Sequence, residues 1–185
     1  MPIFNASTHR MNIFTFGWQN ILAWTAAYCI LEPISYYVIP AFSRSKSVAE
    51  YYDMRRTPVA MVVFGDYIYS TLLFLVAQAV IAQTIGTPAS LSVLGWLRCF
   101  GIFTAVQWSG DLTFYSIISQ LPKTSKYIDF FQRYGKEVGI SAPIGDSIYG
   151  LCWFLIMQGV AMFAPYWSQV TAIVLFMFGT LVLSY

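Results

Sequence analysis

Charged residues are scarce in this chain. Only 10% of its 185 residues are Asp, Glu, Lys or Arg, whereas 58% are hydrophobic. A soluble domain carries about 25% charged residues, so this composition does not fit one. It is typical of transmembrane helices joined by short loops. We therefore predict an all-α, polytopic transmembrane helical bundle that forms a single domain over residues 1–185.

Histidine and grouped cysteines are also lacking. The chain has one histidine, His9, and its three cysteines, Cys29, Cys99 and Cys152, are widely spaced. This disfavours a histidine-based catalytic triad, a haem site, a disulfide framework and a zinc site. A P-loop, a Rossmann fingerprint, a metalloprotease motif and a potassium-filter sequence are absent too. We therefore expect no cofactor and no nucleic-acid partner, and we favour a function that is not enzymatic.

Five apolar stretches are the expected membrane spans. A helix needs about 20 residues to cross the hydrocarbon core of a bilayer. The first and third stretches exceed this length and should tilt or project, whereas the fifth barely spans. The stretches cover residues 12–42, 57–83, 91–121, 139–163 and 168–185.

Basic residues gather in two loops. Eight of the ten Lys and Arg residues lie at 43–57 and 122–138, and the loop at 84–90 carries no charge. By the positive-inside rule, we predict an integral, multi-pass protein with both basic loops on the cytoplasmic or equivalent side. Segments 47–56 and 124–138 mix aromatic and charged residues at near-helical spacing. They predict short interfacial helices or extensions of the long ones.

The chain also contains an internal repeat. GDYIYSTLLFLVAQAV at 65–80 aligns with GDSIYGLCWFLIMQGV at 145–160, with eight identities. Each copy has two spans, so both copies should insert the same way up, related by a pseudo-twofold axis along the membrane normal. This predicts two parallel two-helix repeats, repeat A at 12–83 and repeat B at 91–163. An extra helix at 168–185 lies outside the repeat.

Four carboxylates stand alone inside the apolar stretches, at matching positions of the repeats. Glu32 aligns with Asp111, and Asp66 aligns with Asp146. Each is about ten residues from a basic loop, or roughly 15 Å along a helix, so no Lys or Arg shares its depth. Acids at such depth are costly and usually functional. Gathered around one axis they cannot all ionise, so several are protonated or they hold a cation.

Each of these acids is followed three or four residues later by a tyrosine. Residues so spaced share a helix face, so we expect a phenol beside each acid. Gly65, Gly110 and Gly145 directly precede three of the acids, and small residues let helices approach closely in lipid. The candidate proton- or cation-binding residues are Glu32, Asp66, Asp111 and Asp146, and the supporting residues are Tyr36, Tyr69, Tyr115 and Tyr149.

Two of these segments resemble a known family. SGDLTFYSIIS at 109–119 and PIGDSIYGLCWF at 143–154 are similar to paired Asp motifs of small, uncharacterised four-helix bacterial membrane proteins, and similar membrane proteins occur in large DNA viruses. The family pattern has Asn where this chain has Phe114, and Trp-Gly where it has Tyr149-Gly150. The resemblance covers the repeat unit and implies a four-helix architecture with acidic sites.

Three functions follow as hypotheses. The first is a small transporter or channel whose carboxylate cluster binds protons or a small cation; such a protein could form a homo-oligomer. The second is an accessory or structural subunit of a larger membrane assembly, in which the acids are fully hydrogen-bonded. The third is a membrane enzyme acting on lipid with paired carboxylates, with or without a divalent metal. The lack of histidine places this enzyme last.

Overall fold

The computed structural model describes residues 12–53, 55, 57, 59–87 and 91–184, so His9 lies outside the described part. This part of the chain is entirely helical, as predicted, with seven helices and no strand. The helices are α1 (Trp18–Phe42), α2 (Lys46–Tyr51), α3 (Val59–Thr84), α4 (Val93–Gln120), α5 (Lys126–Val138), α6 (Ser141–Phe163) and α7 (Tyr166–Ser184).

Four of the described helices are long and apolar enough to span a membrane. They are α1, Val62–Thr84 within α3, α6, and Tyr166–Leu183 within α7. The 28-residue α4 is the longest helix, but Arg98, Gln107 and Asp111 make it less apolar. The sequence predicted five spans, and four of them have this composition in the structure.

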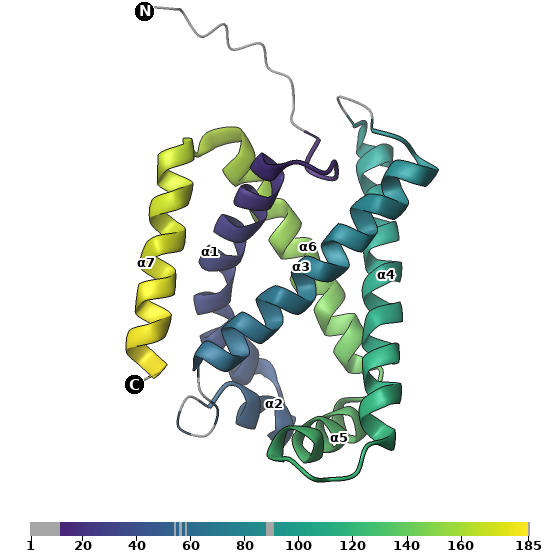
Figure 1. Ribbon diagram of the computed structural model, residues 1–185, viewed down its shortest axis with the longest axis vertical. Coiled ribbons are helices and arrows are strands. Elements are labelled where there is room, and N and C mark those ends of the chain that lie inside the picture. The colour runs from purple at the N-terminus through teal and green to yellow at the C-terminus, as the bar shows by residue number, and fades with distance from the viewer. Residues whose placement is uncertain (1–11, 54, 56, 58, 88–90, 185) are drawn as a thin grey trace, which may run out of the picture.

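The long helices run up and down between two ends of the molecule (Figure 1). The short helices α2 and α5 lie side by side at one end, which we call the basic end. Each begins with a serine cap. The Ser45 hydroxyl accepts the backbone N–H of Val48, and the Ser125 hydroxyl accepts that of Ile128. Such caps satisfy donors that the first turn of a helix leaves unpaired. In the described residues, α2 and α5 are therefore separate short helices and do not extend the long ones.

Packing pairs the long helices in a crosswise manner. α1 packs most extensively on α6, and α3 on α4, while α7 lies against both α1 and α3. The centre of the bundle is a stack of aromatic rings. Trp24 of α1 lies between Phe74 of α3, at 4.2 Å between ring centroids, and Trp153 of α6, at 3.7 Å. All three side chains are fully buried or nearly so. We call these three residues the tryptophan core.

Candidate functional site

The four acids are the only acidic residues in the five long helices, and each stands on a different one. Glu32 lies in α1, Asp66 in α3, Asp111 in α4 and Asp146 in α6. The only basic residue in these helices is Arg98, thirteen residues before Asp111 and therefore about 20 Å away along α4. No cation of the long helices is thus at the level of the acids.

Two of the four acids, Asp66 and Asp146, lie closer to the basic end than the distance of about 15 Å expected from the sequence. Glu32 stands ten residues before the end of α1, about 15 Å along the helix, as expected. Asp66 lies seven residues after the start of α3, and Asp146 only five after the start of α6, or about 10 and 7.5 Å. The estimate counted from the basic residues, but α3 and α6 begin later in the chain.

The structure brings all four acids into one electrostatic group. Glu32 interacts with Asp66, and Asp146 interacts with both Asp66 and Asp111. The group thus runs Glu32, Asp66, Asp146, Asp111, with the two aligned aspartates in the middle. Glu32 is only 2% exposed, and the other three are partly buried. Like charges in a low-dielectric interior disfavour simultaneous ionisation of neighbours.

Two tyrosines bind acids of the opposite repeat. The Tyr149 hydroxyl of α6 donates to Glu32 Oε2 of α1 at 2.6 Å. The Tyr69 hydroxyl of α3 donates to Asp111 Oδ1 of α4 at 2.8 Å. Tyr69 aligns with Tyr149, and Glu32 aligns with Asp111, so the two bonds correspond to each other in the sequence alignment. One bond joins α1 to α6 and the other joins α3 to α4, and these are the two helix pairs that pack most extensively.

The other two candidate tyrosines do not support acids. The Tyr36 hydroxyl is buried without a hydrogen-bond partner in the described residues. Tyr115 is 36% exposed, and its ring packs against Gly135 of α5. The expected pairing of each acid with the tyrosine on its own helix is therefore wrong. The hydroxyl of a tyrosine lies far from its own backbone. It therefore reaches an acid on a neighbouring helix more readily than it reaches a short carboxylate one turn away on its own helix.

Sequence reasoning missed a third phenol, that of Tyr51. This residue ends α2, and its hydroxyl donates to Asp66 Oδ1 at 2.5 Å. Burial, together with the nearby Asp66 carboxyl, holds the pKa of Tyr51 well above its usual value, so the hydroxyl keeps its proton. The signal in the sequence was the aromatic pair Tyr51-Tyr52 in a basic loop, but only the fold brings it beneath α3.

Several polar atoms of the group remain unpaired. Glu32 Oε1 and Asp111 Oδ2 are buried and accept no hydrogen bond from the described residues. Tyr28 lies near Glu32, but its hydroxyl donates its proton to the carbonyl oxygen of Val63 at 2.8 Å. Asp146 receives no hydrogen bond from any described residue. A buried carboxylate oxygen without a partner is expensive, so these atoms can gain from binding a proton.

In the described part of the chain, no three His, Cys, Asp or Glu side chains are grouped so that they could hold a metal ion. Asp66, Asp111 and Glu32 each have one oxygen bound by a phenol instead. The arrangement is one of separate carboxyls that sense each other's charge.

Only one of the three glycines beside the acids permits close packing. A methyl group at Gly110 would lie 2.7 Å from Leu73 Cδ2 and 3.0 Å from the Tyr69 hydroxyl oxygen. The absence of a side chain at Gly110 thus allows Tyr69 to reach Asp111. At Gly65 and Gly145 there is open space, so the expectation of close helix approach is wrong for these two.

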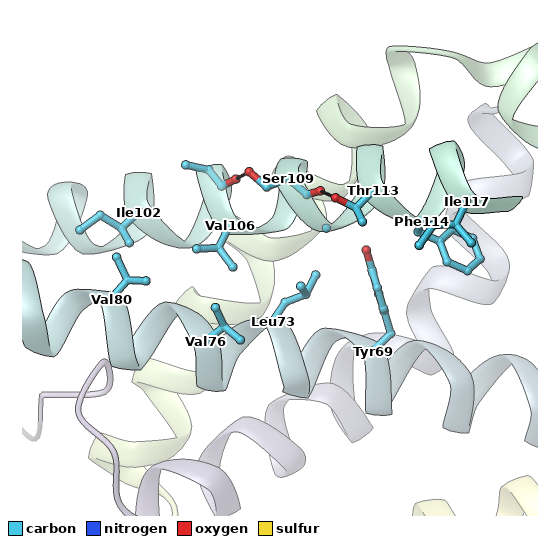
Figure 2. A pocket seen from close by; sticks show the side chains of 12 residues that line it. Tyr69, Leu73, Val76, Val80, Ile102, Val106, Ser109, Thr113, Phe114 and Ile117 are labelled. Atoms are coloured by element: carbon cyan, nitrogen blue, oxygen red, sulfur yellow. Dashed lines mark hydrogen bonds between the residues drawn. The ribbon is translucent and has the colours of Figure 1, made fainter. Parts of the chain in front are cut away.

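An open groove of about 730 Å³ lies between α3 and α4 (Figure 2). It is lined mainly by apolar side chains such as Leu73, Val76 and Val106, and none of the four acids lines it. Figure 2 shows Tyr69 pointing from α3 toward α4 at this groove. Tyr69 lines the groove, and its hydroxyl donates a hydrogen bond to Asp111. The Tyr69 side chain therefore lies between the groove and that acid.

Comparison with known proteins finds no matching family model, no similar curated protein and no similar solved structure. The resemblance to small four-helix bacterial membrane proteins therefore stays a prediction.

Proposed function

We propose that this chain is a multi-pass membrane protein that transports protons, and that its four carboxyls carry them. The observation that carries the proposal is the placement of the four acids on four different long helices. One acid comes from each of α1, α3, α4 and α6, and no Lys or Arg of the long helices is near to neutralise them. Buried ionisable residues without counter-ions in membrane helices mark proton and ion pathways.

The chemistry follows from the order of the group. Neighbouring carboxyls in a low-dielectric interior do not readily ionise together, so a proton taken up by one acid favours the release of a proton from its neighbour. Release from one carboxyl is thus linked to binding at the next. The phenols of Tyr51, Tyr69 and Tyr149 hold the acids in place and stabilise the charged forms by donating hydrogen bonds.

A proton is a better cargo than a metal ion. A dehydrated cation needs several oxygen ligands around one point. The described acids offer no such group of three, and phenols already occupy one oxygen of Glu32, Asp66 and Asp111. A proton needs one free oxygen, and Glu32 Oε1 and Asp111 Oδ2 are both unpaired. The same lack of a ligand group gives no support to a metal-dependent enzyme acting on lipid.

The contacts also support two parallel repeats, with α4 as the spanning counterpart of α1. The Tyr69–Asp111 and Tyr149–Glu32 bonds exchange when repeat A is aligned with repeat B. The aligned rings of Phe74 and Phe154 lie 5.5 Å apart, as residues beside a twofold axis would. In this arrangement the basic end, with α2 and α5, faces the cytoplasm or its equivalent.

An accessory-subunit role is the competing hypothesis. Three of the acids are bonded to tyrosines of other helices, and a purely structural polar core would contain such bonds. The two hypotheses differ in what the acids must do. Transport requires them to exchange protons, whereas a structural core requires only that their shape and hydrogen bonds persist.

The test is a proton-flux assay on the purified chain in liposomes that contain a pH-sensitive dye. A potassium diffusion potential should drive protons inward through the wild type and not through empty liposomes. Asp146→Asn should reduce this flux at least tenfold, while Asp129→Asn, at an exposed acid of α5, should leave it unchanged. Absence of flux in the wild type, or equal flux in Asp146→Asn, would overturn the proposal.

A further inference from the structure

We infer that α2 is a gate that closes the route from the basic end to the acids, with Tyr51 as the residue that seals Asp66. Contacts between α2 and α5 hold this gate shut. The inference rests on the proposed proton transport, since it concerns how the same acids are reached. It assigns a function to four residues that lie outside the group of four acids. These residues are Tyr51, Glu50, Arg133 and Glu137.

Tyr51 covers Asp66 from the side of the basic end. The residue belongs to α2, which lies at that end, and its hydroxyl is bonded to Asp66 Oδ1. Asp66 is only about 10 Å along α3 from its start, so a water molecule from this end would have a short path to it. The phenol occupies one of the two carboxylate oxygens of Asp66.

Aromatic rings fill the level around Tyr51. Its ring stacks on Phe130 at 5.7 Å between centroids and lies 6.3 Å from Phe131. Further ring contacts extend the layer to α1 and α4, because Tyr52 packs on Tyr36 and Phe131 packs on Phe114. We call this set the aromatic layer; its members are Tyr36, Tyr51, Tyr52, Phe114, Phe130, Phe131 and Tyr134. Rings in contact leave little room for water below the acids.

Two sets of polar contacts hold α2 on α5. At the start of α2, the Glu137 carboxylate accepts the backbone N–H groups of Lys46, at 2.7 Å, and Ser47, at 3.1 Å. Near its end, the Arg133 guanidinium donates two bonds to Glu50, at 3.1 and 3.2 Å. We call the contacts of Glu50, Arg133 and Glu137 the clasp. The clasp fixes both ends of the short helix that carries Tyr51.

The clasp is built to open at low cost. The Arg133 side chain is 46% exposed and that of Glu50 is 28% exposed. Exposed ion pairs contribute little to stability. A buried ion pair in this place would fix α2 far more firmly, since breaking one leaves an unpaired buried charge. The solvated ion pair near the end of α2 thus suits a helix end that must leave and return.

The gate is specific to repeat A. The segment Glu50-Tyr51-Tyr52 aligns with Asp129-Phe130-Phe131 of repeat B. Phe130 has no hydroxyl, so it cannot bond Asp146 as Tyr51 bonds Asp66. Asp146 accordingly receives no hydrogen bond from the described residues. The two central acids therefore differ in one feature, the phenol that closes Asp66.

The experiment measures access to the acids without requiring transport. In a variant without native cysteines, Ser70→Cys introduces a thiol one turn beyond Asp66 on the same helix face. A water-soluble, membrane-impermeant thiol reagent is then applied to the protein in lipid nanodiscs. Breaking the Glu50–Arg133 pair of the clasp with Glu50→Gln and Arg133→Gln should raise the rate of labelling about two- to fivefold, as expected for an exposed ion pair. Tyr51→Ala, which removes the seal itself, should raise it at least tenfold.

Lys136→Gln is the matched control. It removes an exposed basic side chain from the same helix, α5, at a position that forms no ion pair with the described residues. Labelling in this variant should match that of the parent. An unchanged rate in both the clasp variant and Tyr51→Ala, each with normal helix content, would overturn the gate.

The outcomes separate the gate from the proposed function. If labelling responds as expected but the wild type shows no proton flux, the gate stands and transport fails. If flux depends on Asp146 but labelling is the same with and without the clasp, transport stands and the gate fails.

Discussion

At the scale of single residues, the acids depend on tyrosines from other helices. The sequence predicted which residue types would meet, because lone carboxylates in apolar stretches stand out from their surroundings. It did not predict which phenol binds which acid. Helical spacing places Tyr69 near Asp66, but the side chain crosses to Asp111 on α4. Partners across helices depend on how the helices pack, which the spacing within one helix does not contain.

Removing the Tyr149 hydroxyl should weaken the fold, because Glu32 is almost fully buried and would lose its donor. We expect Tyr149→Phe to destabilise the protein by about 1–2 kcal/mol, the range for a buried hydrogen bond to a charged or membrane-embedded group. Tyr115→Phe is the control, since that side chain is exposed and packs by its ring. The measurement is unfolding in mixed detergent micelles, and equal stability of the two variants would contradict the assigned bond.

At the scale of elements, α2 and α5 form a unit that caps the bundle. The sequence predicted both short helices from their mixed aromatic and charged residues. It did not predict the contacts between them, because the residues that meet are more than 80 positions apart. The interactions of Arg133 and Glu137 that hold the gate therefore became visible only in the structure.

Acidification should loosen the start of α2. The Ser47 hydroxyl and the Lys46 backbone N–H hold the pKa of Glu137 below its usual value. A lowered folded-state pKa means that this stabilisation is complete above the unfolded value, about 4.3, and is lost as pH falls through the folded value. We expect hydrogen-exchange protection of the Lys46 and Ser47 amides to fall below about pH 4. In Glu137→Gln this loss should be absent; the same pH dependence in that variant would refute the role of the carboxylate.

The docking of α5 on α4 should be sensitive to Gly135. A methyl group there would lie 2.1 Å from Cε2 of Tyr115, so the ring or the helix must move. Overpacking typically costs about 1–3 kcal/mol. We expect Gly135→Ala to lower stability and Tyr115→Ala in the same chain to restore part of it. Gly145→Ala is the control because open space surrounds that site, and equal effects at both glycines would argue against this packing.

At the scale of the whole molecule, the described part of the chain is a helical bundle with four helices long and apolar enough to span a membrane. The sequence predicted the helical class and the apolar stretches, since long hydrophobic runs dominate the chain. The position of α7 was not predictable, because it has no counterpart in the repeat and its faces are similarly apolar. It lies against α1 and α3, both of repeat A. Repeat A and repeat B therefore have different surroundings, although their tyrosine–acid bonds correspond.

The topology predicts the sidedness of the loops. α2 and α5 contact each other, so residues Lys46 and Lys126 should face the same side of the membrane. Cysteines introduced at these two positions should react with an impermeant reagent from one side only. A cysteine at Thr87, at the opposite end of α3, should react from the other side. Reaction of Lys46→Cys and Lys126→Cys from different sides would rule out the arrangement.

The most direct test of the central claim compares the two aligned aspartates in one proton-flux assay. Asp66 and Asp146 are the two middle members of the group of four acids. Asn keeps the shape of Asp but cannot release a proton. We predict that Asp66→Asn and Asp146→Asn each reduce flux at least tenfold in liposomes while the helix content stays that of the wild type. Wild-type flux in both variants would contradict proton transport by these carboxyls.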